Sequence, residues 1–105
     1  MSQLITAQHY LDDEIIAAKR DARDYAVLVS PEFAVGGETY RVVLDGNHSL
    51  AAAVADGVAP EIEVADATAH DAVALLDQGN IDDFLARLHM GEGDYIDAVT
   101  REYVW

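Results

Sequence analysis

The sequence predicts a single α+β domain over residues 1–105: a small mixed β-sheet that contains a hairpin and a βαβ unit, with helices packed around it. Three observations predict this class. The chain has 105 residues, of which 51% are hydrophobic, enough for one core. Short runs rich in β-branched residues alternate with runs in which apolar residues recur at helical spacing. Glycine and proline are sparse and stand at single junctions, as expected in one compact unit.

The first element that the sequence predicts is a helix from Thr6 to about Asp21. Apolar residues recur there at helical spacing, and Thr6 is a suitable N-cap. Acidic residues fall early and basic residues late in this segment, which is the order that the helix dipole favours. A short strand is predicted next, at 26–29.

A hairpin and a βαβ unit follow. The runs 33–35 and 39–44 are rich in β-type residues and flank two glycines at 36–37, which is typical of a hairpin because both turn residues can take positive φ. The second hairpin strand leads into a helix at 48–55 and then into a strand at 61–64. We expect a right-handed crossover here, with the two strands parallel.

The sequence pattern predicts three helices in the last part of the chain. The first covers 69–77 with Thr68 as its cap, the second covers 81–89 with Asn80 as its cap, and the third covers 95–103. The aromatic residues near the end of the chain are expected to pack back onto the core rather than to anchor a partner. They are Tyr95, Tyr103 and Trp105.

Charge and residue types exclude several classes of function. Six basic residues stand against twenty acidic ones, a net charge of −14, so the chain has no basic stripe for nucleic acid and conventional DNA binding is excluded. There is no cysteine for disulfides, thiolate metal sites or nucleophilic catalysis. Residues 1–10 lack the basic flank and apolar stretch of a signal peptide, and no apolar run is long enough for a membrane span. We therefore expect a cytoplasmic protein without membrane contact.

The negative charge is concentrated in the second half of the chain. Residues 1–53 hold four basic and eight acidic residues, and residues 54–105 hold two and twelve. Either the surface serves solubility or a salt-rich habitat, or an acidic face meets a basic protein partner or imitates DNA phosphates. The candidate residues for such a face are Asp77, Asp82, Asp83, Glu92, Asp94 and Asp97.

One segment combines residues that could carry chemistry, where the predicted strand ends at Asp45-Gly46. The backbone N–H groups of Asn47, His48 and Ser49 come at the start of a helix, which is a general site for phosphate or another anion. Gly46 would let the backbone approach a ligand, and His48 is the candidate catalytic residue, with Asp45 as its acid–base partner or as a metal ligand. Alternatively, Asp45 or Asn47 caps the helix, Gly46 makes the turn and His48 bonds to its own loop.

The stretch from Tyr40 to Val64 resembles the ParB/sulfiredoxin-like superfamily. Its core is Leu44-Asp45-Gly46-Asn47-His48-Ser49-Leu50 with the alanines that follow, then Asp56-Gly57 and Pro60-Glu61-Ile62-Glu63-Val64. In that family a strand leads into an Asp-Gly-x-His-Arg loop over nucleotide phosphates, then into a short helix and a strand. The resemblance implies this fold, with Gly46 as the loop glycine, His48 as the motif histidine and Ser49 in the place of the arginine. It also implies CTP or ATP binding, or ATPase or nuclease activity.

The chain departs from the family at the residues that matter for phosphate. Ser49 has neither the charge nor the fork geometry of an arginine, and a triphosphate would need Mg²⁺ against so acidic a protein. We therefore expect a catalytically silent member without a cofactor or a bound metal, which binds a basic protein, for example as a DNA-mimicking or counter-defence inhibitor from a phage or plasmid. Two alternatives remain: a Mg-nucleotide- or phosphate-binding domain with weak ATPase or nuclease activity at Asp45 to Ser49, or a homodimerising accessory protein without a ligand.

Overall fold

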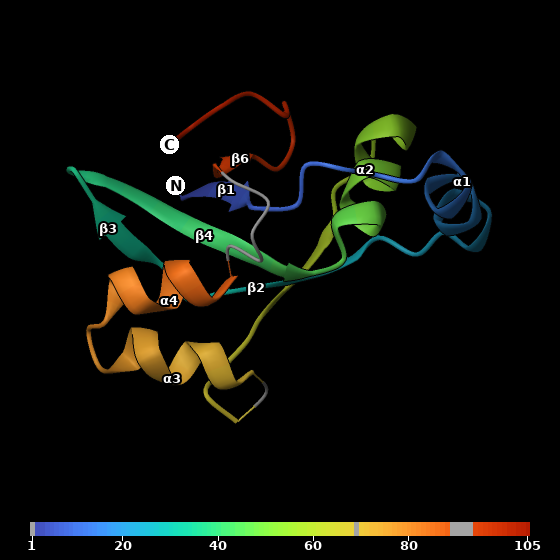
Figure 1. Ribbon diagram of the computed structural model, residues 1–105. Helices are drawn as coiled ribbons and strands as arrows, with labels where there is room; N and C mark the ends of the chain where they lie inside the picture. The colour runs from blue at the N-terminus through green and yellow to red at the C-terminus, as the bar shows by residue number, and fades with distance from the viewer. Residues whose placement is uncertain (1, 69, 89–93) are drawn as a thin grey trace.

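The computed structural model describes residues 2–68, 70–88 and 94–105, and it is built around one mixed sheet (Figure 1). The strand order is β5-β2-β4-β1-β6, and β3 pairs with β4 beside this path. The strands are β1 (Gln3–Thr6), β2 (Ala26–Val29), β3 (Phe33–Val35), β4 (Glu38–Asp45), β5 (Glu61–Val64) and β6 (Ile96–Asp97). The helices are α1 (Asp13–Ala22), α2 (Asn47–Asp56), α3 (Asp71–Asp77) and α4 (Ile81–Leu88). The predicted α+β class is confirmed.

The long strand β4 supplies side chains to two hydrophobic clusters. Val42 belongs to a cluster with Phe84 of α4, whereas its neighbour Val43 belongs to a cluster with Leu50 of α2. Successive side chains of a strand point to opposite faces, so the two clusters lie on opposite sides of the sheet. Figure 1 shows α3 and α4 below β3 and β4, with α1 and α2 at the far end of the molecule. The core is therefore divided between the two faces.

The predicted hairpin and the helix after it are confirmed. β3 and β4 pair antiparallel, from Phe33 opposite Tyr40 to Val35 opposite Glu38. The turn between them is Gly36-Gly37, with φ of 60° and 85°. α2 begins directly after β4 and ends before a glycine in the left-handed conformation, Gly57. Local patterning predicts these elements because they depend on neighbouring residues.

The prediction of a helix from Thr6 is wrong at its start. Thr6 is the last residue of β1, is buried, and pairs with β6. α1 begins at Asp13, and its N-cap is Asp12, whose carboxylate accepts a hydrogen bond of 2.8 Å from the backbone N–H of Glu14. The strand could not be recognised locally, because its partners β4 and β6 lie far along the chain.

The predicted parallel pair of strands around α2 is also wrong. β5 pairs in parallel with β2, and β2 pairs antiparallel with β4, so β5 runs opposite to β4. β4 has no open edge for β5, because β2 and β3 pair along one side of it and β1 pairs along the other. The chain therefore crosses over to the free edge of β2, and the parallel partner of β4 is β1.

The helix predicted at 95–103 is not formed. Ile96 and Asp97 form β6 against β1, the chain turns, and Tyr103 returns to bridge Ile96. Trp105 packs as expected, with ring centroids 5.4 Å from Tyr40 and 5.1 Å from Tyr95. Tyr103, by contrast, is 68% exposed.

The two helices before it form close to where they were predicted. α3 begins at Asp71 with His70 as its cap, because the Nδ1 atom of His70 accepts a hydrogen bond of 3.2 Å from Ala72. The predicted cap, Thr68, bonds to Asp66 instead. α4 spans Ile81–Leu88, and residues 69 and 89, the other predicted bounds, lie outside the described residues.

Candidate functional site

The turn from β4 into α2 requires glycine for a reason of packing. Gly46 has φ of 94° and is the N-cap of α2. A Cβ atom at this position would lie 2.5 Å from the carbonyl oxygen of Ala26 in β2. The missing side chain therefore lets α2 begin directly against the backbone of β2, and the position is explained without a ligand.

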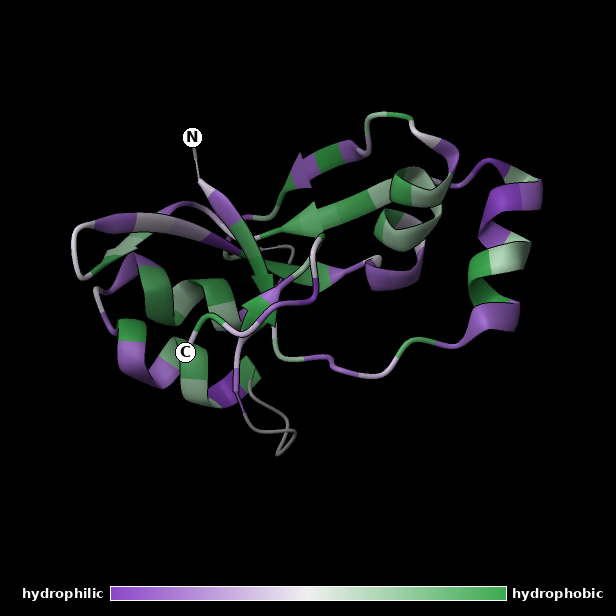
Figure 2. Ribbon diagram, turned by 90° about the horizontal axis from the view of Figure 1, so that it is seen from above, coloured by the Kyte–Doolittle hydropathy of each residue, from purple (hydrophilic) through white to green (hydrophobic). Residues whose placement is uncertain are grey.

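His48, the candidate catalytic residue, is engaged in a contact between two helices. Its Nε2 atom accepts a hydrogen bond of 3.1 Å from the backbone N–H of Asp12, the N-cap of α1. α1 has no buried residue and packs on α2 at one end of the molecule (Figure 2), so this bond joins the starts of the two helices. The imidazole thus has a structural role in joining α1 to α2.

Ser49, which stands where the resemblance has its arginine, is buried. Its side chain is 2% exposed, and its hydroxyl donates to Asp24 over 3.4 Å. Asp24 also accepts a hydrogen bond of 2.9 Å from Lys19. The bond from Lys19, then that from the backbone of Ala26, lowers the pKa of the Asp24 carboxyl. Lys19 reaches the loop from α1 and was not predicted as part of this site, because no sequence motif marks it.

The structure brings all five predicted loop residues, Asp45 to Ser49, to one small hollow of about 210 Å³, which Gln8 and Lys19 also line. Asn47 donates to Gln8 over 3.4 Å, while its Oδ1 atom is buried without a hydrogen-bond partner among the described residues. An unpaired oxygen repels phosphate rather than attracting it. Lys19 is the cation of this hollow, and it is paired with Asp24.

The predicted acidic face is divided in space. Asp77, Asp82 and Asp83 are exposed near the turn between α3 and α4, and the two residues of α4 border a shallow hollow of about 490 Å³. Asp94 is exposed in the segment before β6, and Glu92 lies outside the described residues. Asp97 is in β6, at the opposite end of the strand order from β5.

Asp97 holds a turn rather than facing solvent. Its carboxylate accepts hydrogen bonds of 2.8 Å from Gln3 and from the backbone N–H groups of Val99 and Thr100. Burial would raise the pKa of Asp97, but the bonds from Thr100, Gln3 and Val99 together hold it below its usual value. Three aspartates of the predicted face, Asp77, Asp82 and Asp83, therefore form the group near α3 and α4.

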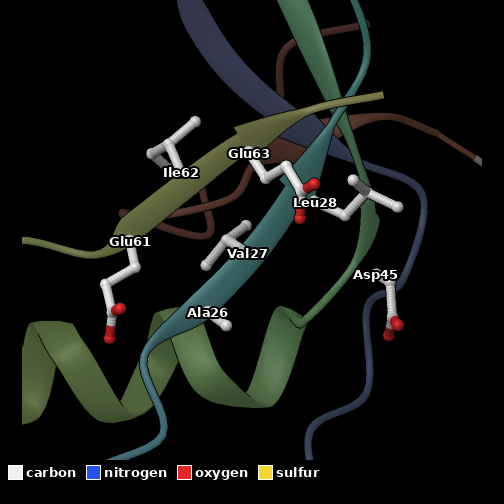
Figure 3. A pocket seen from close by; sticks show the side chains of 7 residues that line it. All are labelled: Ala26, Val27, Leu28, Asp45, Glu61, Ile62 and Glu63. Carbon is white, nitrogen blue, oxygen red and sulfur yellow. The ribbon is translucent and has the colours of Figure 1, made fainter. Parts of the chain in front are cut away.

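A second acidic group was not predicted, and it lies on β5. All four residues of this strand are exposed. The register places Glu61 beside Ala26, Glu63 beside Leu28, and Leu28 beside Asp45, so three carboxylates share one face of the sheet. Figure 3 shows them around an open hollow of about 480 Å³. The alternating run Glu61-Ile62-Glu63-Val64 is a sequence signal for a strand with one charged face.

Most basic side chains in the described part of the chain are neutralised by contacts within the protein. Ion pairs join Lys19 to Asp24, Arg20 to Asp56, Arg41 to Glu32 and Arg87 to Asp71, with distances of 2.9, 2.7, 3.4 and 4.0 Å. Arg101 donates to the carbonyl oxygens of Gln8 and His9. The unpaired charge at the surface is therefore strongly negative.

The chain matches no family model, no curated protein and no solved structure. The resemblance to the ParB/sulfiredoxin-like superfamily thus stays a prediction that rests on residues 40–64. The described residues include no group of three or more histidine, aspartate or glutamate side chains placed to hold a metal ion. None of the described helices has the length and apolar character for crossing a membrane.

Proposed function

We propose that this protein acts by binding a basic surface of another protein, without catalysis at the loop from Asp45 to Ser49. The surplus of carboxylates is the observation that carries the proposal. Twenty acidic residues face six basic ones, and four of those six are already ion-paired. A surface of this sign attracts cationic partners and repels nucleic acid. An inhibitor that takes the place of DNA on a basic protein is one role that fits, in the cytoplasm that the sequence suggests.

The contacts of the loop support a silent site. His48 accepts from Asp12, Ser49 donates to Asp24, and Gly46 is needed for packing against β2. A bound triphosphate would have to displace Asp24 from Lys19 and would face the carboxylate of Asp45. These costs favour protein binding over nucleotide binding.

The experiment is affinity capture with the full chain as bait, in low and in high salt, using lysate of the source cells. We expect a basic protein to be captured and released as salt rises, because screening weakens attraction between exposed charges. A bait carrying Asp82→Asn and Asp83→Asn should capture less, whereas Gln78→Ala on the same surface should not change capture. Capture of no protein, or capture that is independent of salt, contradicts the proposal.

The phosphate-binding alternative is tested by titration calorimetry with Mg-ATP and Mg-CTP. The expected affinity is weaker than millimolar. Micromolar binding that disappears in His48→Ala would restore the nucleotide-binding alternative. Light scattering addresses the remaining alternative, since a stable dimer without any captured partner would favour the accessory role.

A further inference from the structure

We infer that the outer edge of β5 accepts an extended strand of the partner protein, with basic and apolar residues in alternation. The inference rests on the proposed function, because it names the surface and the type of segment through which a basic partner would bind. It depends on three properties of β5: free backbone groups, uncovered side chains and charge on one face.

The free backbone groups follow from the pairing of β5 with β2. The N–H of Glu61 donates to Tyr25 over 2.9 Å, and the N–H of Ala65 donates to Val29 over 2.8 Å. In a parallel ladder alternate residues bond to the same neighbour, so the N–H and C=O groups of Ile62 and Val64 point away from β2. β5 ends the strand order, and no described strand lies beyond it (Figure 2). These groups are available to an added strand.

The side chains of β5 are uncovered on both faces. Ile62 and Val64 are 44% and 50% exposed, although their neighbours in β2, Val27 and Val29, are buried. The hydrophobic cluster under this face includes Val27 and Val29 but not the side chains of β5. An added strand would cover Ile62 and Val64 with its own apolar residues.

The face of β5 that carries Glu61 and Glu63 determines which charge the added strand should carry. Figure 3 shows Glu61 and Ile62 leaving the strand in opposite directions, with Glu63 and Asp45 around the same hollow as Glu61. A strand added here would place every second side chain beside Glu61 and Glu63, whereas Asp45 lies two strands further in, on β4. Lysine or arginine at those positions gains opposite-charge neighbours, whereas glutamate or aspartate is repelled.

A second copy of the chain is a poor occupant for the same reason. Two β5 strands can pair antiparallel about a two-fold axis with their sheet faces aligned. With Ile62 opposite Ile62, Glu61 stands opposite Glu63 of the other copy, and with Ile62 opposite Val64, Glu63 stands opposite Glu63. Like charges directly opposite destabilise a strand pair. The two glutamates therefore protect the edge against self-association and leave it open to a basic segment.

The test uses the full chain and a short capped peptide in which lysine alternates with valine and threonine. Calorimetry gives its affinity, and hydrogen exchange followed by NMR gives the protection of individual amides. We expect the peptide to slow the exchange of the Ile62 and Val64 amides. The same peptide with glutamate for lysine, or with N-methyl groups on alternate amides, should not bind. Equal binding of the glutamate peptide, or protection confined to other strands, overturns the inference.

Two variants separate charge from pairing. The double variant Glu61→Gln and Glu63→Gln should weaken binding of the lysine peptide about three- to tenfold, because two exposed ion pairs are lost. The matched control, Glu38→Gln with Glu102→Gln, removes the same charge from two exposed positions outside both acidic groups and should leave the affinity unchanged. Ile62→Pro removes an outward N–H that β2 does not use, so the sheet should persist while binding is lost. If the proline variant unfolds, the affinity of the Glu61→Gln, Glu63→Gln variant for the lysine peptide still tests the inference.

The two proposals fail in different ways. If a basic protein is captured equally well by wild type and by the glutamine pair at Glu61 and Glu63, but less by the bait with Asp82→Asn and Asp83→Asn, protein binding stands and the inference about β5 falls. If no protein is captured, the proposed function falls. A dimer whose interface protects Ile62 and Val64 also overturns the inference, because a second copy then occupies the edge.

Discussion

The buried hydroxyl of Ser49 donates to the carboxylate of Asp24 over 3.4 Å, and this contact joins the first turn of α2 to the segment between α1 and β2. The same carboxylate accepts from Lys19 of α1. Position 49 is thus enclosed by its own protein. An arginine here, as in the resembling family, would lose the bond to Asp24 and would place a long charged side chain at a position that is 2% exposed.

Ser49→Arg is therefore expected to destabilise the fold rather than to create a phosphate clamp. Overpacking a buried site costs about 2 kcal/mol in the free energy of unfolding. Urea unfolding measures the loss, and Ser49→Ala, which removes one hydrogen bond, should cost about 1 kcal/mol. An arginine variant with unchanged stability and micromolar affinity for Mg-ATP would contradict this account.

Gly46→Ala should be among the most damaging single substitutions in the turn. The new Cβ would lie 2.5 Å from the carbonyl oxygen of Ala26, in a conformation with φ of 94°. We expect a loss of about 3 kcal/mol in the free energy of unfolding, from a close contact and a strained backbone. Gly57→Ala is the matched control, since its φ is 67° and nothing lies within 4 Å of the added atom. It should cost about 1 kcal/mol. Equal losses would show that the approach to β2 is unimportant.

His48→Ala should loosen α1. The substitution removes the acceptor for the N–H of Asp12 and costs about 1 kcal/mol. Because α1 buries no residue, the effect should be local: its amides should exchange faster while those of β4 stay protected. Val54→Ala, at an exposed position of α2, is the control and should change neither. Faster exchange throughout the sheet would contradict a local role.

We expect the ionisation of Tyr95 to lower the free energy of unfolding at alkaline pH. Burial raises the pKa of its phenol to about 12, and the hydroxyl donates to the carbonyl oxygen of Leu85 over 2.6 Å. In the unfolded chain the phenol ionises near pH 10, at about its ordinary pKa. The contribution of Tyr95 is therefore complete below pH 10 and is lost as the pH rises toward 12.

The measurement is the thermal midpoint as a function of pH, together with phenolate absorbance. Tyr95→Phe should lower stability near neutral pH by about 1 kcal/mol, because the carbonyl oxygen loses its donor. It should also flatten the alkaline decline. Tyr103→Phe, at a side chain that is 68% exposed, should leave both unchanged. A phenolate signal for Tyr95 near pH 10 in the folded protein would contradict the prediction.

The local sequence pattern was sufficient to predict those helices and strands that depend mainly on neighbouring residues. The glycines at 36–37 indicated the hairpin, and the Asp45-Gly46 junction indicated the start of α2. β1 was not predicted from the sequence. Its four residues match neither the helical nor the strand hydrophobic period strongly, and its pairing with β4 and β6 depends on the whole fold. The direction of β5 depended on which sheet edge was free, and this is known only after β1 and β2 are placed.

The residues of the candidate site could likewise be predicted from the sequence only in part. Residues 45–49 are contiguous, so the sequence could place them together, and the structure does so. Their partners Asp12, Lys19 and Asp24 come from another part of the chain and carry no motif. The carboxylates of Asp45, Glu61 and Glu63 are brought together only by the register of three strands.

The position of β1 affects how the chain folds. This early segment lies between β4 and β6 in the finished sheet, so its hydrogen bonds form only after two long loops have closed. Loop closure costs entropy before the contacts repay it, and chains rich in such distant pairings fold in milliseconds to seconds rather than microseconds. Until β1 pairs with β4, the backbone groups along one edge of β4 are unpaired. The partly folded chain is most prone to aggregate at that stage.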